Sequence, residues 1–246
     1  MTRVWNQAEF ERNYKDLIVE GHFNENKTYY PRYRSRYEYL LRRYANIAPP
    51  VPQRVLDIGG GQLALMTSAL WGDDCHAADI GGTHLDYLRS KCVSTTEWNL
   101  CLEPAKFELE FDVVFFSEVI EHLPIPAHEV FRKVHQGLKP DGVMICSTPN
   151  LYRLRNIVYL ILGLPIFDNF RTPDGEGLGH VIEYSAEHLQ WQIQRAGFDN
   201  IVVDLVQFHH SPVNVLFRLM YWVGSPLFLV ARFRDNLVAT ARRKQD

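Results

Sequence analysis

The 246-residue sequence has few cysteines, no apolar N-terminal core and no long uninterrupted hydrophobic run. Its four cysteines show no CxxC spacing, so neither a cysteine-ligated metal module nor a disulfide-dense secreted domain is expected. The opening residues, MTRVWNQAEFERNYKD, carry charges where a signal peptide needs apolar residues. We therefore expect a cytoplasmic protein with reduced, mostly buried thiols.

A strong net charge is also missing, because 26 basic and 29 acidic residues leave a formal charge of −3. This balance gives no reason to expect a nucleic-acid partner. Basic residues do gather in 27–44 and 232–246. These two segments indicate either an anionic ligand or surface, or simply solvated helix faces.

Strands and helices alternate through the middle of the chain. The apolar patterns predict strands at 54–59, 75–80, 94–100, 111–117 and 143–149, and helices at 62–71, 83–92 and 126–138. KPDG at 139–142 reads as a turn. Alternation at this rhythm predicts an α/β, Rossmann-like fold: a mostly parallel sheet with helices on both faces.

The chain divides into three parts by composition. Residues 1–48 are expected to form an N-terminal helical lid, and 49–208 the α/β core with a substrate-side insertion at 151–184. Residues 209–246 are expected to form an apolar and basic helical extension. Its apolar stretch is broken by Arg218 and by glycine and proline, so a membrane span is not expected. Segment 211–246 could lie at the inner membrane face, pack on the core or form a dimer contact.

The stretch RVLDIGGGQLALM, residues 54–66, runs from a strand through three glycines into a helix. Gly59, Gly61 and Ala64 match a dinucleotide pattern, and Asp79 lies 20 residues after Gly59. An acid there suits a ribose diol, which NAD and S-adenosylmethionine (SAM) share. Asp57 ends the first strand, where a carboxylate suits an amino-acid ammonium better than a pyrophosphate. Alternatively, Asp57 only caps the glycine turn.

Five segments then occur in the order found in class I SAM-dependent methyltransferases: VLDIGGG, AADI, FDVVFFSEVIEHLP, LKPDGVMICSTPN and GHVIEYSAEHLQWQIQRAGF. Over about 52–205 the chain resembles this family, and in particular the broad group of ubiquinone-type O-methyltransferases and sugar or polyketide methyltransferases. The resemblance implies a seven-stranded sheet whose last strand is antiparallel. It also implies SAM as cofactor and S-adenosylhomocysteine (SAH) as product.

The resemblance further implies a set of cofactor-binding residues. The methionine part would be bound by Asp57, Gly59, Gly60 and Gly61, and the ribose by Asp79. The adenine would lie beside Ile80, Asn99 and Leu100. The region near the sulfur would be lined by Ser117 and Glu118. One position departs from the pattern, because the family often has a third glycine where this chain has Leu63. We expect the leucine to narrow the approach to the methionine carboxylate.

Three residues are candidates for catalysis, namely His180, His122 and Glu118. An imidazole titrates near neutrality and can take the proton of a hydroxyl acceptor. His180 in GHVIEYS is the preferred base, although it and Tyr184 could merely anchor the loop. His122 could equally have a structural or cofactor-side role. No metal site is expected, since the pair His209–His210 has no third ligand nearby in sequence.

The main interpretation is SAM-dependent O-methylation of a small-molecule or glycan-type intermediate. A quinone or other prenylated lipid precursor is the alternative acceptor, suggested by the apolar C-terminal segments. An NAD-dependent reductase and a non-catalytic SAM-binding or membrane-scaffold protein are the alternatives of other classes. Tyr87 and Lys91 have the Tyr-x-x-x-Lys spacing of short-chain reductases, but they fall in the helix after the second strand, too early in the chain.

Overall fold

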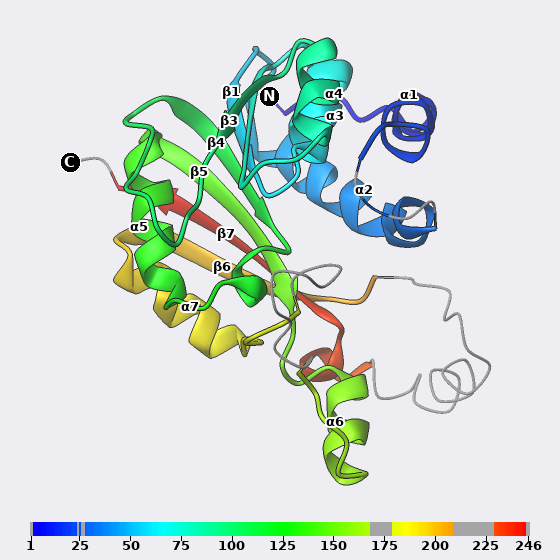
Figure 1. Cartoon of the computed structure of the whole chain (residues 1–246), viewed down its shortest axis with the longest axis vertical. Helices are drawn as coiled ribbons and strands as arrows, with labels where there is room; N and C mark the ends of the chain where they lie inside the picture. The colour runs from blue at the N-terminus through cyan, green and yellow to red at the C-terminus, as the bar shows by residue number, and fades with distance from the viewer. Residues whose placement is uncertain (1, 24, 26–27, 168–178, 209–228, 245–246) are drawn as a thin grey trace.

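The computed structural model describes residues 2–23, 25, 28–167, 179–208 and 229–244 (Figure 1). Their strands form one seven-stranded sheet in the order β3-β2-β1-β4-β5-β7-β6. The strands are β1 (Arg54–Ile58), β2 (Asp74–Asp79), β3 (Ser94–Glu97), β4 (Phe111–Ser117), β5 (Leu138–Pro149), β6 (Phe198–Val206) and β7 (Asn236–Arg243). β7 is antiparallel to β5 and β6, whereas β1 to β5 pair in parallel. The predicted Rossmann-like sheet, mostly parallel and seven-stranded, is confirmed.

Helices cover both faces of the sheet. One face carries α1 (Gln7–Asn13), the π-helix η1 (Tyr14–Val19), α2 (Tyr29–Ile47), α3 (Gln62–Trp71) and α4 (His84–Ser90). The other carries α5 (Ala127–Gly137) and α7 (Ala186–Arg195), while α6 (Leu154–Ile161) projects away from the sheet (Figure 1). Two short 3-10 helices, η2 (Ile120–His122) and η4 (Ala231–Phe233), complete the described elements.

The continuous apolar run FDVVFFS forms the central strand β4, as predicted. Val113 and Phe115 belong to the core on the side of α3, and Val114 and Phe116 to the core on the side of α5. All four side chains are nearly inaccessible to solvent. A parallel strand that is covered on both faces needs apolar residues at every position, which explains the absence of alternation.

The end of the chain differs from the sequence expectation. The helical extension predicted for 209–246 is wrong for Asn236–Arg243, which form β7 between β5 and β6. Leu237, Ala239 and Ala241 pack into one core and Val238 into the other. Alanine and leucine are strong helix formers, but burial between two strands overrides that weak preference. Residues 209–228, the greater part of the predicted apolar hairpin, lie outside the described residues.

A second correction concerns KPDG at 139–142, which lies within β5 rather than in a separate turn. The pairing of β4 with β5 shifts register between Phe111 and Val113, and Asp141 takes the left-handed conformation at φ 62°. Residues 139–142 therefore continue β5, and they make the strand irregular at this point. Among the described helices, none is long and apolar enough to cross a membrane.

Buried polar contacts fix the N-terminal helices to the core. The carboxylate of Asp73 accepts hydrogen bonds from both Nη atoms of Arg3 at 2.7 and 2.9 Å, and from the hydroxyl of Tyr44 at 2.6 Å. The backbone amide of Gln53 donates to the same carboxylate at 2.9 Å. Arg3 and Asp73 are both buried, so this pair joins the start of the chain to the strand β2 that follows Asp73.

We expect Asp73→Ala to lower the free energy of unfolding by about 3–5 kcal/mol, because it leaves the buried guanidinium of Arg3 without its carboxylate. Urea denaturation measures the change. The control is Asp86→Ala, which breaks an exposed ion pair with Arg89 on α4 and should cost less than about 1 kcal/mol. Equal losses in the two variants would show that the buried pair does not hold the N-terminal helices in place.

Candidate functional site

Two cavities of about 480 Å³ each meet at the carboxyl ends of β1 and β4. This edge is where ligands bind in open α/β sheets. The first, here called the polar cavity, lies between α2 and the sheet and is lined by residues that include Tyr30, Arg36, Asp57, Ser117, Glu121 and His180. The second, here called the apolar cavity, is lined by residues that include Ile58, Asp79, Ile80, Trp98, Asn99 and Leu100. Gly59, Glu118 and His122 line both, so they mark the junction.

The glycine turn between β1 and α3 brings the backbone to this junction. Gly59 has φ 91°, and a Cβ atom added there would lie 2.2 Å from Cγ2 of Val119. Gly61 has φ 82°, and a Cβ there would clash with Leu88 and Ala77. Glycine is therefore required at both positions by conformation and by space. The turn forms a backbone cradle that a bound ligand can approach closely.

The backbone at position 63 does not require the glycine that the family often has there. Leu63 lies in the first turn of α3, its side chain is buried in the core, and its φ is negative. Its backbone amide donates to Oδ2 of Asp57 at 2.8 Å, and the amide of Ala64 donates to the same atom at 3.1 Å. Asp57 thus caps the amino end of α3 and also lines the polar cavity.

Asp57 is an unusual carboxyl group, because it is only 3% exposed. Burial raises its pKa to about 7, against the two amide hydrogen bonds from α3, which lower it. Its ionised form therefore lacks a compensating cation among its described partners. A ligand that brings a positive group to this end of the polar cavity would supply one.

Asp79 ends β2 and lies beside the apolar cavity. One carboxylate oxygen accepts from the amide of Ile80 at 2.6 Å, and the other lies 3.3 Å from Nε2 of His84. Asn99 stabilises the next loop, where its side-chain oxygen accepts from the amides of Cys101 and Leu102 at 3.0 and 3.2 Å. A carboxylate beside an apolar cavity suits a ligand in which a sugar carries a flat ring system: the carboxylate accepts hydrogen bonds from the sugar hydroxyls, and the cavity holds the ring.

Glu118 is held in place by three groups from different parts of the chain. Its Oε2 lies 3.0 Å from Nη1 of Arg36 on α2, and its Oε1 accepts from the hydroxyl of Ser147 on β5 at 2.8 Å. Asn236 on β7 donates to Oε1 at 3.4 Å. Glu118 adopts φ 55°, a conformation that non-glycine residues rarely take. These contacts offset the cost of this conformation and fix the segment that follows β4.

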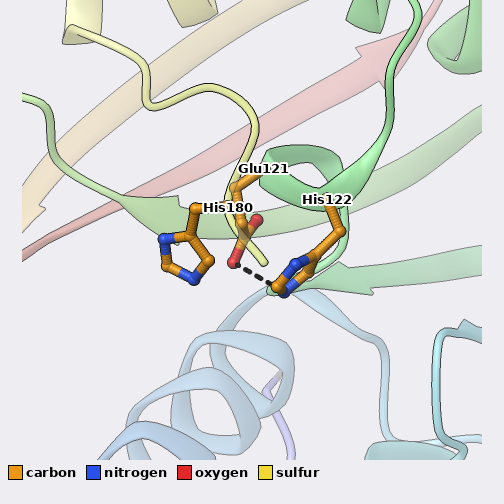
Figure 2. A group of neighbouring side chains, drawn as sticks. All are labelled: Glu121, His122 and His180. Carbon is orange, nitrogen blue, oxygen red and sulfur yellow. Dashed lines mark ion pairs between the residues drawn. The ribbon is translucent and has the colours of Figure 1, made fainter. Parts of the chain in front are cut away.

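Glu121, His122 and His180 all line the polar cavity, and their side chains lie close together (Figure 2). Their potential ligand atoms all lie within 4.8 Å of one another, and Nε2 of His122 lies 4.0 Å from Oε1 of Glu121. The rings of His122 and His180 meet edge to face at 4.9 Å between centroids. Burial, and then the charge of Glu118, raise the pKa of Glu121 well above its usual value.

His180 reaches the cluster because the backbone after it pairs with η2. The amides of Val181 and Ile182 donate to the carbonyl of Glu121 at 2.8 and 3.3 Å. Nδ1 of His180 lies 3.3 Å from Oε1 of the buried Glu183.

Glu183 is itself bound on two further sides. Arg153 forms an ion pair with it, and the side chain of Asn156 donates to it at 2.6 Å. Burial raises the pKa of Glu183, but the hydrogen bond from His180, the charge of Arg153 and the bond from Asn156 outweigh it and hold that pKa below its usual value. An ionised Glu183 therefore faces Nδ1 of His180.

Of the site residues predicted from the sequence, all but Gly60 and Gly61 line one or both cavities. Sequence reasoning missed Arg153 and Arg36 as specific partners of the site. Their carboxylate partners lie 30 and 82 positions away along the chain, so no local pattern could pair them. Tyr30 was expected only as part of the N-terminal lid. In the structure it lines the polar cavity, and its hydroxyl accepts a hydrogen bond from the side chain of Gln62 on α3 at 3.0 Å.

Comparison with known families decides the family. The model for the methyltransferase domain matches residues 30–203, which is most of the chain and includes the whole lining of the apolar cavity and most of that of the polar cavity. The chain belongs to the class I SAM-dependent methyltransferases. No curated protein matches the sequence.

Solved structures share the fold of this methyltransferase at low sequence identity. A SAM-dependent methyltransferase from Archaeoglobus fulgidus has a TM-score of 0.58 and 17% identity, over 89% of this chain and 100% of that one. One from Mesorhizobium loti has a TM-score of 0.54 and 16% identity, over 85% and 98%. Phosphoethanolamine N-methyltransferase 2 from Haemonchus contortus, solved with SAM, has a TM-score of 0.54 and 17% identity, over 95% of this chain and 56% of that one.

The family membership resolves the choice of cofactor that the glycine pattern left open. The methyltransferase uses SAM rather than NAD, so the dinucleotide interpretation and the reductase alternative fall away. The residues present suit that cofactor: a crowded glycine turn, a buried acid near it and a second acid beside an apolar slot.

We expect Asp57→Asn to make the ligand-free methyltransferase more stable at pH 8. The folded pKa of about 7 exceeds the unfolded value, so ionisation of Asp57 opposes folding as the pH rises from about 4 to about 7. The gain should grow over that range, reach up to about 4 kcal/mol and stay level above it. Urea denaturation at several pH values measures it. The control Asp86→Asn, at an exposed position, should show no such trend; a pH-independent effect of Asp57→Asn would contradict the assignment.

Proposed function

We propose that this methyltransferase transfers the methyl group of SAM to a hydroxyl oxygen of a small-molecule or glycan-type intermediate. The observation that carries the proposal is the junction of the two cavities at Gly59, Glu118 and His122. One cavity suits a nucleoside, and the other brings two imidazoles to the same junction. SAM supplies a methyl group made electrophilic by its sulfonium, and the residues of the chain orient and deprotonate the acceptor.

In this proposal the apolar cavity holds the adenosine part of the cofactor. Asp79 accepts hydrogen bonds from the ribose hydroxyls, Ile80 lies against the adenine, and Asn99 with Leu100 lines its edge. The proposal is supported by the position of all four around one cavity. Asp57 and the turn Gly59–Gly61 face the methionine part, with Asp57 close to its ammonium. Ser117 lies on the polar side of the junction, close to the sulfur.

The polar cavity then receives the acceptor, and His180 takes its proton. The ionised Glu183 at Nδ1 of His180 favours a proton on that nitrogen, which leaves the lone pair on Nε2. His122 is the second imidazole of the same cavity. Glu118 serves as a positioning residue in this proposal, because its carboxylate is bound by Arg36 and Ser147. Alignment of the acceptor with the sulfonium supplies much of the acceleration.

A prenylated lipid or quinone precursor is the second candidate acceptor. Three consecutive apolar residues at the end of α6, Leu160, Ile161 and Leu162, are 63%, 78% and 64% exposed. Exposed apolar side chains in a row favour contact with an apolar partner over bulk water. A peripheral membrane contact was expected through 211–246, but Asn236–Arg243 lie in the sheet between β5 and β6 and are not part of this proposal.

We expect SAH to bind the purified protein and NAD not to bind, as measured by isothermal titration calorimetry. Asp79→Asn should weaken SAH binding by about 10- to 100-fold, because a charged acceptor for the ribose hydroxyls is lost. The control Asp112→Asn lies in β4 outside both cavities and should leave the affinity unchanged. Unchanged affinity in Asp79→Asn would show that the ribose binds elsewhere.

We expect His180→Ala to reduce methyl transfer by about 100-fold or more while SAH affinity stays within a factor of two or so. The assay uses SAM with a labelled methyl group and fractionated cell extract as the source of acceptor. His188→Ala, an exposed histidine on α7 outside the cavity, is the matched control. Full transfer by His180→Ala would place the proton acceptor elsewhere. Label recovered on nitrogen or carbon would refute O-methylation.

A further inference from the structure

The cluster of Glu121, His122 and His180 has the composition of a metal site as well as that of a proton-transfer site. It offers one carboxylate and two imidazoles, with ligand atoms within 4.8 Å of one another (Figure 2). Ions such as Zn²⁺ are bound at about 2.0–2.2 Å in a tetrahedral arrangement, so two ligand atoms on one ion lie about 3.3–3.6 Å apart. The three ligand atoms, which lie within 4.8 Å of one another, therefore need to close by about 1 Å to share an ion.

Both imidazoles have their Nδ1 atoms beside hydrogen-bond acceptors. Nδ1 of His122 lies 3.2 Å from the carbonyl of Gly179, and Nδ1 of His180 lies 3.3 Å from Oε1 of Glu183. A carbonyl or carboxylate at Nδ1 places the proton there and the lone pair on Nε2. Histidines that bind metal ions nearly always donate their other ring N–H to such a group.

The side chain of Glu121 is also oriented by a hydrogen bond from a neighbouring residue. Its side chain is 1% exposed, and its Oε2 accepts from the hydroxyl of Thr148 on β5 at 3.0 Å. Its Oε1 is the oxygen nearest to Nε2 of His122, at 4.0 Å. Arg36 and Arg153 line the same cavity, but Arg36 lies 3.0 Å from Glu118 and Arg153 is paired with Glu183. A cation held between Glu121 and the imidazoles would compensate the buried carboxylate.

We propose that Glu121, His122 and His180 bind one divalent transition-metal ion on the acceptor side of the polar cavity. Two imidazoles and one carboxylate favour ions such as Zn²⁺, Co²⁺ or Mn²⁺ over Mg²⁺ and Ca²⁺, which prefer oxygen ligands alone. Three protein ligands leave at least one coordination position for a further group, as in catalytic rather than structural metal sites.

The inference rests on the proposed function in one respect, namely that the open position faces a hydroxyl acceptor. A coordinated hydroxyl loses its proton to solvent more easily than a free one. Its oxygen then forms the bond to the methyl carbon while the bond from that carbon to sulfur breaks, which leaves neutral SAH. His180 cannot be a ligand through Nε2 and take the proton at the same atom. The ion would therefore take over the task given to His180 above.

The test measures metal binding directly, on the full chain after treatment with a chelator and with SAH bound. Co²⁺ is the probe, because its visible absorption reports nitrogen and oxygen ligation, and Zn²⁺ is then added in competition. We expect one Co²⁺ per chain, displaced by Zn²⁺ and not by an excess of Mg²⁺. His180→Ala and Glu121→Gln should each weaken Co²⁺ binding by at least about 100-fold while SAH still binds.

Two further variants separate a metal site from adventitious binding to histidine. Thr148→Val keeps all three ligands and removes the hydroxyl that orients Glu121, so it should weaken Co²⁺ binding by about 10- to 100-fold. His188→Ala removes an exposed histidine of α7 and should leave binding unchanged. Thr148→Val also serves if Glu121→Gln does not fold.

The outcomes distinguish this proposal from the function on which it rests. No Co²⁺ binding by a protein that binds SAH would refute the metal site and leave His180 as the proton acceptor. Binding that survives in His180→Ala would also refute it. Failure of the wild-type protein to bind SAH would instead refute the assignment of the cofactor cavity. Methyl transfer that is lost with the chelator and restored by Zn²⁺ or Mn²⁺ would support the metal site.

Discussion

The ion pair between Arg36 and Glu118 is the contact on which the site depends. It joins α2, near the start of the chain, to the residue that directly follows the central strand β4. The guanidinium lies among the rings of Tyr29, Tyr33 and Tyr37, at 4.8 to 5.8 Å from their centroids, so α2 presents it from an aromatic cage. Without this cation, Glu118 would be a half-buried carboxylate without its ion pair, in a strained backbone conformation.

The position of Glu118 governs the groups around it. The 3-10 helix η2 begins two residues after it, with Glu121 buried in the protein and His122 at the junction of the two cavities. Its charge is also one of the causes that raise the pKa of Glu121. The segment SEVIEHLP thus connects the apolar cavity to the polar cavity through one backbone turn and one ion pair.

The core of the fold was predictable because its signals are local. The run FDVVFFS has no polar position to place on a solvent face, so it had to be a strand covered on both sides. RVLDIGGG combines a strand with a turn that only glycine can make. Ser185 is a local signal of the same kind, because a serine before a helix can cap it, and here its hydroxyl accepts from the amide of His188 at the start of α7. The segment Asn236–Arg243 was misjudged because NLVATARR carries helix-forming residues, and only its neighbours β5 and β6 make it a strand.

The sequence by itself determined the order of strands and helices from β1 to β5, the glycine turn and the family resemblance, since each depends on residues close together in the chain. Most of the site residues that it named line one or both cavities. Only the tertiary structure decided their partners: Arg36 for Glu118, Glu183 for His180 and Thr148 for Glu121. All but the second lie far apart in sequence, and the roles of carboxylates and imidazoles depend on which charges and hydrogen bonds surround them. Distances of a few ångströms between such groups arise only when the sheet brings their loops to one edge.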